Sequence, residues 1–369
     1  MSSAFTAREI FTGHEILTGM AVLVRDGKIK GVVALDQVPA GYRLRDTSAY
    51  MLAPSFIDLQ LYGGNGKLFS AELSVESLEA THEYCMHGGC SHFMITMATN
   101  SMEKMLSGIE TVRQYWATGG SGLLGLHLEG PYINPEKKGA HIEKYIKKPE
   151  VAEVKSLLQK GKGVIKMITV APERCDKEII DLLLRSGILV SAGHSNATYE
   201  EAINAFYAGI PAATHLFNAM SPLQGRGSGM VGAIYDHNEV MSSIVCDGIH
   251  VDFSSVRISK KLMQERLFFI TDAVVEIQHG EYMHLWKGDR YTLPNGTLSG
   301  SALTMLQAVK NGVEKVGILL PEALRMASLY PAKLLGIDAK QGSLKPGANA
   351  DFVALDEQLN LQQLILAGE

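Results

Sequence analysis

The sequence predicts an α/β protein, a (β/α)8 TIM barrel with a small β-sandwich domain built from both chain ends. Apolar, strand-like runs alternate with helical patterns about eight times over about 270 residues, which matches a closed barrel better than an open doubly wound sheet. Short strand-like runs with polar turns stand at both ends of the chain. No Gly-x-Gly-x-x-Gly sequence follows the first strand of the alternating region, which removes the main support for a dinucleotide-binding fold.

The composition predicts a soluble globular protein whose partners are small molecules. The 369 residues are 46% hydrophobic and 20% charged, which excludes a disordered chain or a coiled coil. The net charge of -5 and the lack of a lysine-arginine cluster argue against nucleic acid as a partner. No apolar run approaches the roughly 20 residues that span a bilayer, and no signal-peptide pattern opens the chain, so we expect no membrane partner and a cytoplasmic location.

Both ends of the chain are rich in short strands. Asp26-Gly27 lies between two β-rich runs and predicts a tight hairpin. After a helical pattern near 321–335, short strands separated by turns return. We therefore expect a small domain made of residues 1–51 and 340–369, and a barrel made of residues 52–339.

The barrel strands and helices are expected in strict alternation. The expected strands are 52–59, 91–97, 123–129, 165–171, 188–193, 211–215, 241–247 and 267–272. The helical patterns include 72–88, 102–116, 174–186, 198–208 and 302–315.

Four of these strands end in an ionisable residue. Glu129 closes the third strand, and Gly130-Pro131 behind it cannot continue a central strand. His194, His215 and Asp272 end the fifth, sixth and eighth strands in the same way. Because the carboxyl ends of barrel strands converge on one mouth, we expect these four side chains to meet.

One carboxylate and two imidazoles are a typical ligand set for a catalytic divalent metal ion. We therefore predict that one ion is bound by Glu129, His194 and His215. This ligand set suits zinc, iron, manganese and cobalt alike. Asp272 follows a wholly apolar run, which suits a general base that serves the metal-activated water. A fourth ligand or a helix cap is the alternative for Asp272.

Other polar residues are weaker candidates. Arg226 stands among glycines that free backbone N–H groups for an anion, although a flexible surface loop has the same composition. Leu298-Ser299-Gly300 precedes a helix expected from Ser301, whose N-terminus is suited to a hydroxyl or an anionic group. His127 is expected to be a packed core histidine. Gln60, near the end of the first strand, is a poor metal ligand and argues against a two-metal centre.

Taken together, these segments resemble the N-acetylglucosamine-6-phosphate deacetylases of the amidohydrolase superfamily. The resemblance runs nearly from end to end and rests on Pro54–Asp58, His127–Pro131, Val190–Ala197, Ala213–Met220, Asp247–His250, Gly296–Ser301 and Gly342–Asp351. It implies hydrolysis of the acetamido group of an amino-sugar 6-phosphate, giving acetate and the free amine.

The resemblance also implies residue roles. Glu129, His194 and His215 match the metal ligands, Asp272 the acid/base, and His141 a histidine that polarises the amide carbonyl. The matched substrate positions are Ala140, Asn218, Ala219, Arg226, His250, Leu298, Ser299 and Gly300. Members of the family are commonly homodimers, in which the neighbouring subunit contributes to the phosphate site.

Two departures from the family pattern leave alternatives open. Asp58-Leu59-Gln60 replaces the His-x-His of the wider superfamily, which implies one essential metal and leaves a second site near Asp58 and Gln60 in question. Val274–His279 replaces the usual turn after Asp272, so the choice between gluco and galacto epimers is open. The rival functions are another amidohydrolase, such as a galactosamine-type deacetylase or a dihydroorotase-like enzyme, and a non-catalytic scaffold.

Overall fold

The computed structural model describes residues 2–369 and divides the chain into two compact units. One unit comprises the chain up to Asp58 together with Cys85–His92 and Thr304–Glu369, and the other comprises Leu59–Tyr84 and Phe93–Leu303. The domain limits expected from the sequence stay a prediction. Within residues 2–369, no helix is both long and apolar enough to cross a membrane.

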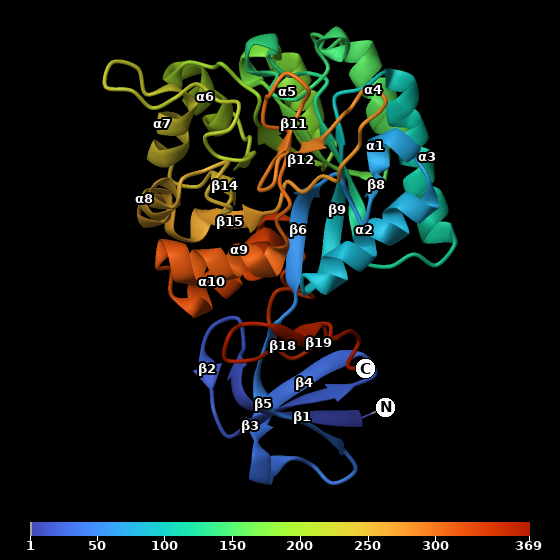
Figure 1. The fold of residues 1–369 in the computed structure, drawn as a ribbon, viewed down its shortest axis with the longest axis vertical. Coiled ribbons are helices and arrows are strands. Elements are labelled where there is room, and N and C mark those ends of the chain that lie inside the picture. Colours follow the sequence, from blue (N-terminus) through green and yellow to red (C-terminus); the bar gives the residue numbers. More distant parts are fainter. Residues whose placement is uncertain (1) are drawn as a thin grey trace. The chain divides into compact units, whose positions relative to one another are not determined.

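The predicted fold class is confirmed: eight parallel strands form a nearly closed barrel (Figure 1). In sheet order they are β6 (Phe56–Leu61), β9 (Cys90–Ala98), β10 (Leu123–Glu129), β11 (Ile165–Val170), β12 (Leu189–Ala192), β13 (Ala212–Ala213), β14 (Met241–Val245) and β15 (Leu267–Ile270). A parallel bridge between Leu61 and Ala273 brings the first strand beside the chain that follows the last. The carboxyl ends of the strands therefore surround one mouth.

Helices alternate with these strands along the chain. They are α1 (Phe69–Glu72), α2 (Val75–His87), α3 (Met102–Ala117), α4 (Val151–Lys160), α5 (Lys177–Arg185), α6 (Tyr199–Tyr207), α7 (Gly229–Asp236) and α8 (Phe253–Met263). Helix α6 begins at a capping box, in which the Thr198 hydroxyl accepts from the Glu201 N–H and the Glu201 carboxylate accepts from the Thr198 N–H. The loops contain two short antiparallel strand pairs. These are β7 (Gly63–Gly64) with β8 (Lys67–Leu68), and β16 (Leu285–Trp286) with β17 (Tyr291–Thr292).

Strands from both chain ends form a separate seven-stranded mixed sheet. Its order is β19 (Leu361–Ile365), β18 (Phe352–Leu355), β5 (Arg43–Pro54), β1 (Ser2–Phe11), β3 (Met20–Arg25) and β4 (Lys28–Ala34), and β2 (Ile16–Leu17) pairs with β1. The hairpin at Asp26-Gly27 joins β3 to β4, and both turn residues have positive φ angles, 52° and 69°. The same unit contains α9 (Met305–Asn311), α10 (Leu320–Ala327) and α11 (Leu329–Leu334).

Two expected boundaries are wrong. The run from 52 to 54 belongs to β5, where Leu52 pairs with Ala354, and the first barrel strand begins only at Phe56. Hydrophobic periodicity does not reveal that an apolar run passes from one sheet to another. The helix expected from Ser301 begins at Met305, because Thr304 caps it, and Ser301 instead pairs with Ala273 in a β-bridge.

Replacing Phe352 with alanine is expected to destabilise the sheet built from both chain ends. Phe352 is fully buried and its ring meets that of Phe5 edge-on, with 5.0 Å between the ring centroids. Loss of such a ring costs about 3–5 kcal/mol in the free energy of unfolding. Denaturant unfolding would measure this change. Leu44→Ala is the matched control, because Leu44 is 64% exposed and its loss should change the free energy by less than about 0.5 kcal/mol.

Candidate active site

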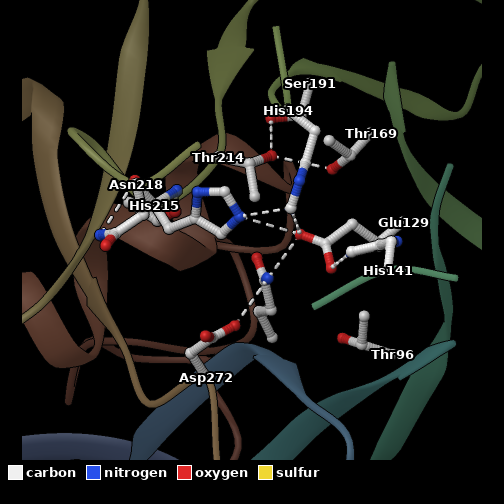
Figure 2. Close-up of polar contacts among 12 residues, drawn as sticks. Thr96, Glu129, His141, Thr169, Ser191, His194, Thr214, His215, Asn218 and Asp272 are labelled. Carbon is white, nitrogen blue, oxygen red and sulfur yellow. Dashed lines mark hydrogen bonds and ion pairs between the residues drawn. The ribbon is translucent and has the colours of Figure 1, made fainter. Parts of the chain in front are cut away.

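Glu129, His194 and His215 meet at the carboxyl end of the barrel. Glu129 Oε1 lies 3.0 Å from His215 Nε2 and 3.3 Å from His194 Nε2, and the two histidine Nε2 atoms are 3.0 Å apart. All three side chains are buried, and they come from the ends of β10, β12 and β13. Figure 2 shows both imidazoles turned toward the carboxylate.

The hydrogen bonds around these residues leave ligand atoms free for a metal ion. His194 Nδ1 lies 2.8 Å from the carbonyl oxygen of Lys137, which only accepts, so Nδ1 carries the proton and Nε2 keeps its lone pair. Burial alone would raise the pKa of Glu129, yet the facing histidines hold it well below its usual value. The carboxylate is therefore charged.

The three atoms fit a divalent metal ion. Tetrahedral ligands at about 2.0–2.1 Å from an ion are themselves about 3.3 Å apart, close to the separations between these atoms. Glu129, His141 and His194 also have ligand atoms within 4.8 Å of one another. The Thr99 N–H, however, donates to His141 Nδ1 at 3.2 Å, and burial lowers the pKa of His141 to about 4. The neutral ring thus carries its proton on Nε2, which makes His141 a donor and favours His215 as the third ligand.

Asp272 lies beside the carboxylate of Glu129. The side-chain amide of Gln60 donates to Glu129 Oε1 and to Asp272 Oδ1, each at 2.8 Å. Burial raises the pKa of Asp272, an effect that the charge of His215 opposes. Tyr62, which the sequence did not single out, donates its hydroxyl to Glu129 Oε2. Gln60 and Tyr62 thus each donate a hydrogen bond to the carboxylate of Glu129.

Three of these residues have a strained backbone. His194, His215 and Asp272 have φ angles of 47°, 37° and 54°, in the left-handed region that residues with a Cβ seldom adopt. Such strain persists where the surroundings fix the chain, and it concentrates at functional sites.

Behind the site, His127 is a core residue, as expected. It is fully buried, its Nε2 lies 2.8 Å from Thr169 Oγ1, and burial lowers its pKa to about 4. Thr169 Oγ1 in turn lies 2.8 Å from Thr214 Oγ1, so hydrogen-bonded side chains pack beneath Glu129, His194 and His215.

A cavity of about 230 Å³ opens over these residues. Besides the four strand-end residues, the predicted site residues that line it are Ala140, His141, Asn218, Ala219, His250, Leu298, Ser299 and Gly300. Arg226 does not line it: this arginine lies in an exposed turn closed by hydrogen bonds between Gln224 and Gly227. Sequence reasoning missed several lining residues, among them Tyr62, Tyr282 and His284. The unusual stretch Val274–His279 lies just before the last two but does not contain them.

Comparison with known proteins places this site in a family. Residues 51–369 match the model of the Amidohydrolase family, and residues 3–48 match that of the NagA composite domain. N-acetylglucosamine-6-phosphate deacetylase of Haemophilus influenzae is 36% identical over 98% of this chain and 97% of its own. N-acetylgalactosamine-6-phosphate deacetylase of Escherichia coli O157:H7 is 32% identical over 100% of this chain and 99% of its own.

Solved structures agree with the sequence relatives. N-acetylglucosamine-6-phosphate deacetylase of Pasteurella multocida superposes with a TM-score of 0.95 at 36% identity, covering 100% of this chain and 99% of that one. A mutant deacetylase of Mycobacterium smegmatis, in complex with N-acetyl-D-glucosamine-6-phosphate, has a TM-score of 0.93 at 28% identity, covering 100% of this chain and 98% of that one. The chain therefore belongs to the amidohydrolase family, whose members are metal-dependent enzymes.

Proposed function

We propose that the protein hydrolyses the acetamido group of N-acetylglucosamine 6-phosphate, giving glucosamine 6-phosphate and acetate, with one divalent metal ion. The observation that carries the proposal is the triangle of Glu129, His194 and His215 beside the buried carboxylate of Asp272. The deacetylases that match nearly the whole chain support the choice of substrate.

Each residue of the site has a part in this reaction. When bound between Glu129, His194 and His215, a divalent ion supplies the Lewis acidity that activates water for attack on an amide carbonyl. Asp272 accepts the proton of the attacking water and returns it to the departing amine nitrogen. The His141 Nε2–H, which faces Glu129 Oε2 at 3.0 Å in the structure, donates to the carbonyl oxygen of the bound substrate, where negative charge develops. The sugar phosphate is held by His250, Asn218, Ala219, Ala140 and the Leu298–Gly300 turn.

Acetate release from three substrates tests the proposal. The metal-loaded enzyme should act on N-acetylglucosamine 6-phosphate much faster than on unphosphorylated N-acetylglucosamine, and removal of the metal by a chelator should abolish the activity. Equal turnover with and without the phosphate would favour a different amidohydrolase reaction. Because one relative is an N-acetylgalactosamine-6-phosphate deacetylase, the galacto epimer is the third substrate, and faster turnover of it would reassign the function to that enzyme.

We also propose that the protein is a homodimer in which Arg226 serves the cavity of the neighbouring subunit. Arg226 is exposed and does not line its own cavity, although its loop follows the residues Asn218 and Ala219 that do. A guanidinium carried across a subunit interface is suited to a phosphate. The cytoplasmic location expected from the sequence stays a prediction.

Arg226→Ala is expected to raise KM for the phosphorylated sugar by about tenfold to a hundredfold, the usual effect of losing one charge-assisted hydrogen bond. The turnover of unphosphorylated substrate should not change. Arg185→Ala is the matched control, because Arg185 lies on α5 and contacts Asp181. Mixing Arg226→Ala with Asp272→Asn subunits should restore tight binding, since one mixed site has both residues. Lack of restoration would place Arg226 in its own subunit's site or outside it.

A further inference from the structure

His284 is a cavity residue with no part in the chemistry described above. It lies between Ala273 and Gly300, beyond the stretch Val274–His279 that departs from the family pattern, and it is 5% exposed. Its backbone is fixed, because the His284 N–H donates to Ile277 O at 2.8 Å and the Ile277 N–H donates to His284 O at 3.0 Å. A side chain held in this way is ready to bind before a ligand arrives.

The contacts of the ring occupy one of its two nitrogens. His284 Nδ1 lies 2.9 Å from Ser299 Oγ, and a hydroxyl can donate to a ring nitrogen or accept from it. Burial lowers the pKa of His284 to about 4, so the imidazole is neutral near pH 7. Nε2 is therefore the nitrogen that remains for a ligand.

Within residues 2–369, no protein atom forms a hydrogen bond with His284 Nε2. This nitrogen is also not one of the fully enclosed polar atoms that lack a partner, so it is accessible. Since the residue lines the cavity, Nε2 is open to whatever fills it. A neutral ring nitrogen pairs well with a group that can both donate and accept, as a hydroxyl does. The groups of this kind that a sugar offers in greatest number are its ring hydroxyls.

We propose that His284 is a specificity-determining residue whose Nε2 forms a hydrogen bond with a ring hydroxyl of the substrate. The proposal rests on the proposed function, because it takes an amino-sugar phosphate as the ligand of this cavity. It adds a contact from the segment between Asp272 and Ser299 to those already proposed for this cavity.

Two isosteric variants separate the two nitrogens. In His284→Asn the amide N–H can keep the Nδ1 contact to Ser299, but no atom remains at the Nε2 position. In His284→Gln the side-chain amide reaches the Nε2 position and can donate or accept there. We expect the asparagine variant to raise KM about threefold to tenfold, the effect of losing one neutral hydrogen bond, with kcat nearly unchanged. The glutamine variant should stay closer to wild type. His279→Asn, at an exposed position of the same loop, is the control.

Substrate analogues complete the test. The 1-, 3- and 4-deoxy analogues of N-acetylglucosamine 6-phosphate are compared on wild type and on His284→Asn by their kcat/KM values. For one analogue, the ratio of the wild-type kcat/KM to that of His284→Asn should fall toward one, because the hydroxyl that His284 contacts is then absent. An unchanged ratio with all three analogues, or an equal loss in the asparagine and glutamine variants, would overturn the proposal. If wild type released acetate from neither epimer of the full substrate, the proposed function would fail first and this inference with it.

Discussion

Replacing Asp272 with asparagine is expected to lower kcat by about a hundredfold to ten-thousandfold while the metal ion stays bound. The amide has nearly the shape of the carboxylate, and its oxygen can still accept the hydrogen bond that Gln60 now donates at 2.8 Å. It has no basic oxygen with which to take a proton from water, and it has no proton to return to the leaving nitrogen. The loss therefore falls on kcat rather than on substrate binding.

The measurement pairs metal analysis with acetate release at saturating substrate. Asp181→Asn is the matched control, because Asp181 lies on α5 and its carboxylate contacts Lys177 and Arg185 at the surface. Loss of metal from the Asp272 variant would identify Asp272 as a ligand, the alternative that the sequence left open. Retention of wild-type kcat would show that another group transfers the proton.

The residues that the sequence predicted share one local signal. Glu129, His194, His215 and Asp272 each follow a short apolar run, and the barrel brings the ends of such runs together. This held even for β13, which has only two residues, Ala212–Ala213, because the signal depends on where the strand ends and not on its length. The fold class and the meeting of these four side chains were therefore accessible before any coordinates.

The residues that the sequence missed depend on contacts between distant segments. Tyr62 is important because its hydroxyl reaches Glu129, 67 positions away, and nothing in its own surroundings in the chain indicates this. His284 acquires its orientation from Ser299 across the hairpin of β16 and β17. The proton positions on His141 and His194 are likewise set by backbone groups of Thr99 and Lys137. Periodicity does not encode such pairings.

Glu129→Gln is expected to lower the affinity for the metal ion by at least about a hundredfold, and the activity with it, because it removes the only carboxylate among the three proposed ligands. The substitution also disturbs the donors around this side chain. Gln60 donates to Oε1, while the Tyr62 hydroxyl and His141 Nε2–H face Oε2, so either orientation of the amide sets its NH2 group against a donor. The variant should fold but no longer hold the ion.

Metal titration followed by thermal unfolding measures this effect independently of catalysis. Wild type should gain thermal stability when the ion is added, since a ligand that binds only the folded state stabilises it, and the Glu129 variant should gain little. Glu153→Gln is the matched control, because Glu153 contacts Tyr132 and Lys147 and does not line the cavity. A wild-type thermal shift in the Glu129 variant would mean that the ion is held by histidines alone, and the geometry of the site would then have to be reassigned around His141, His194 and His215.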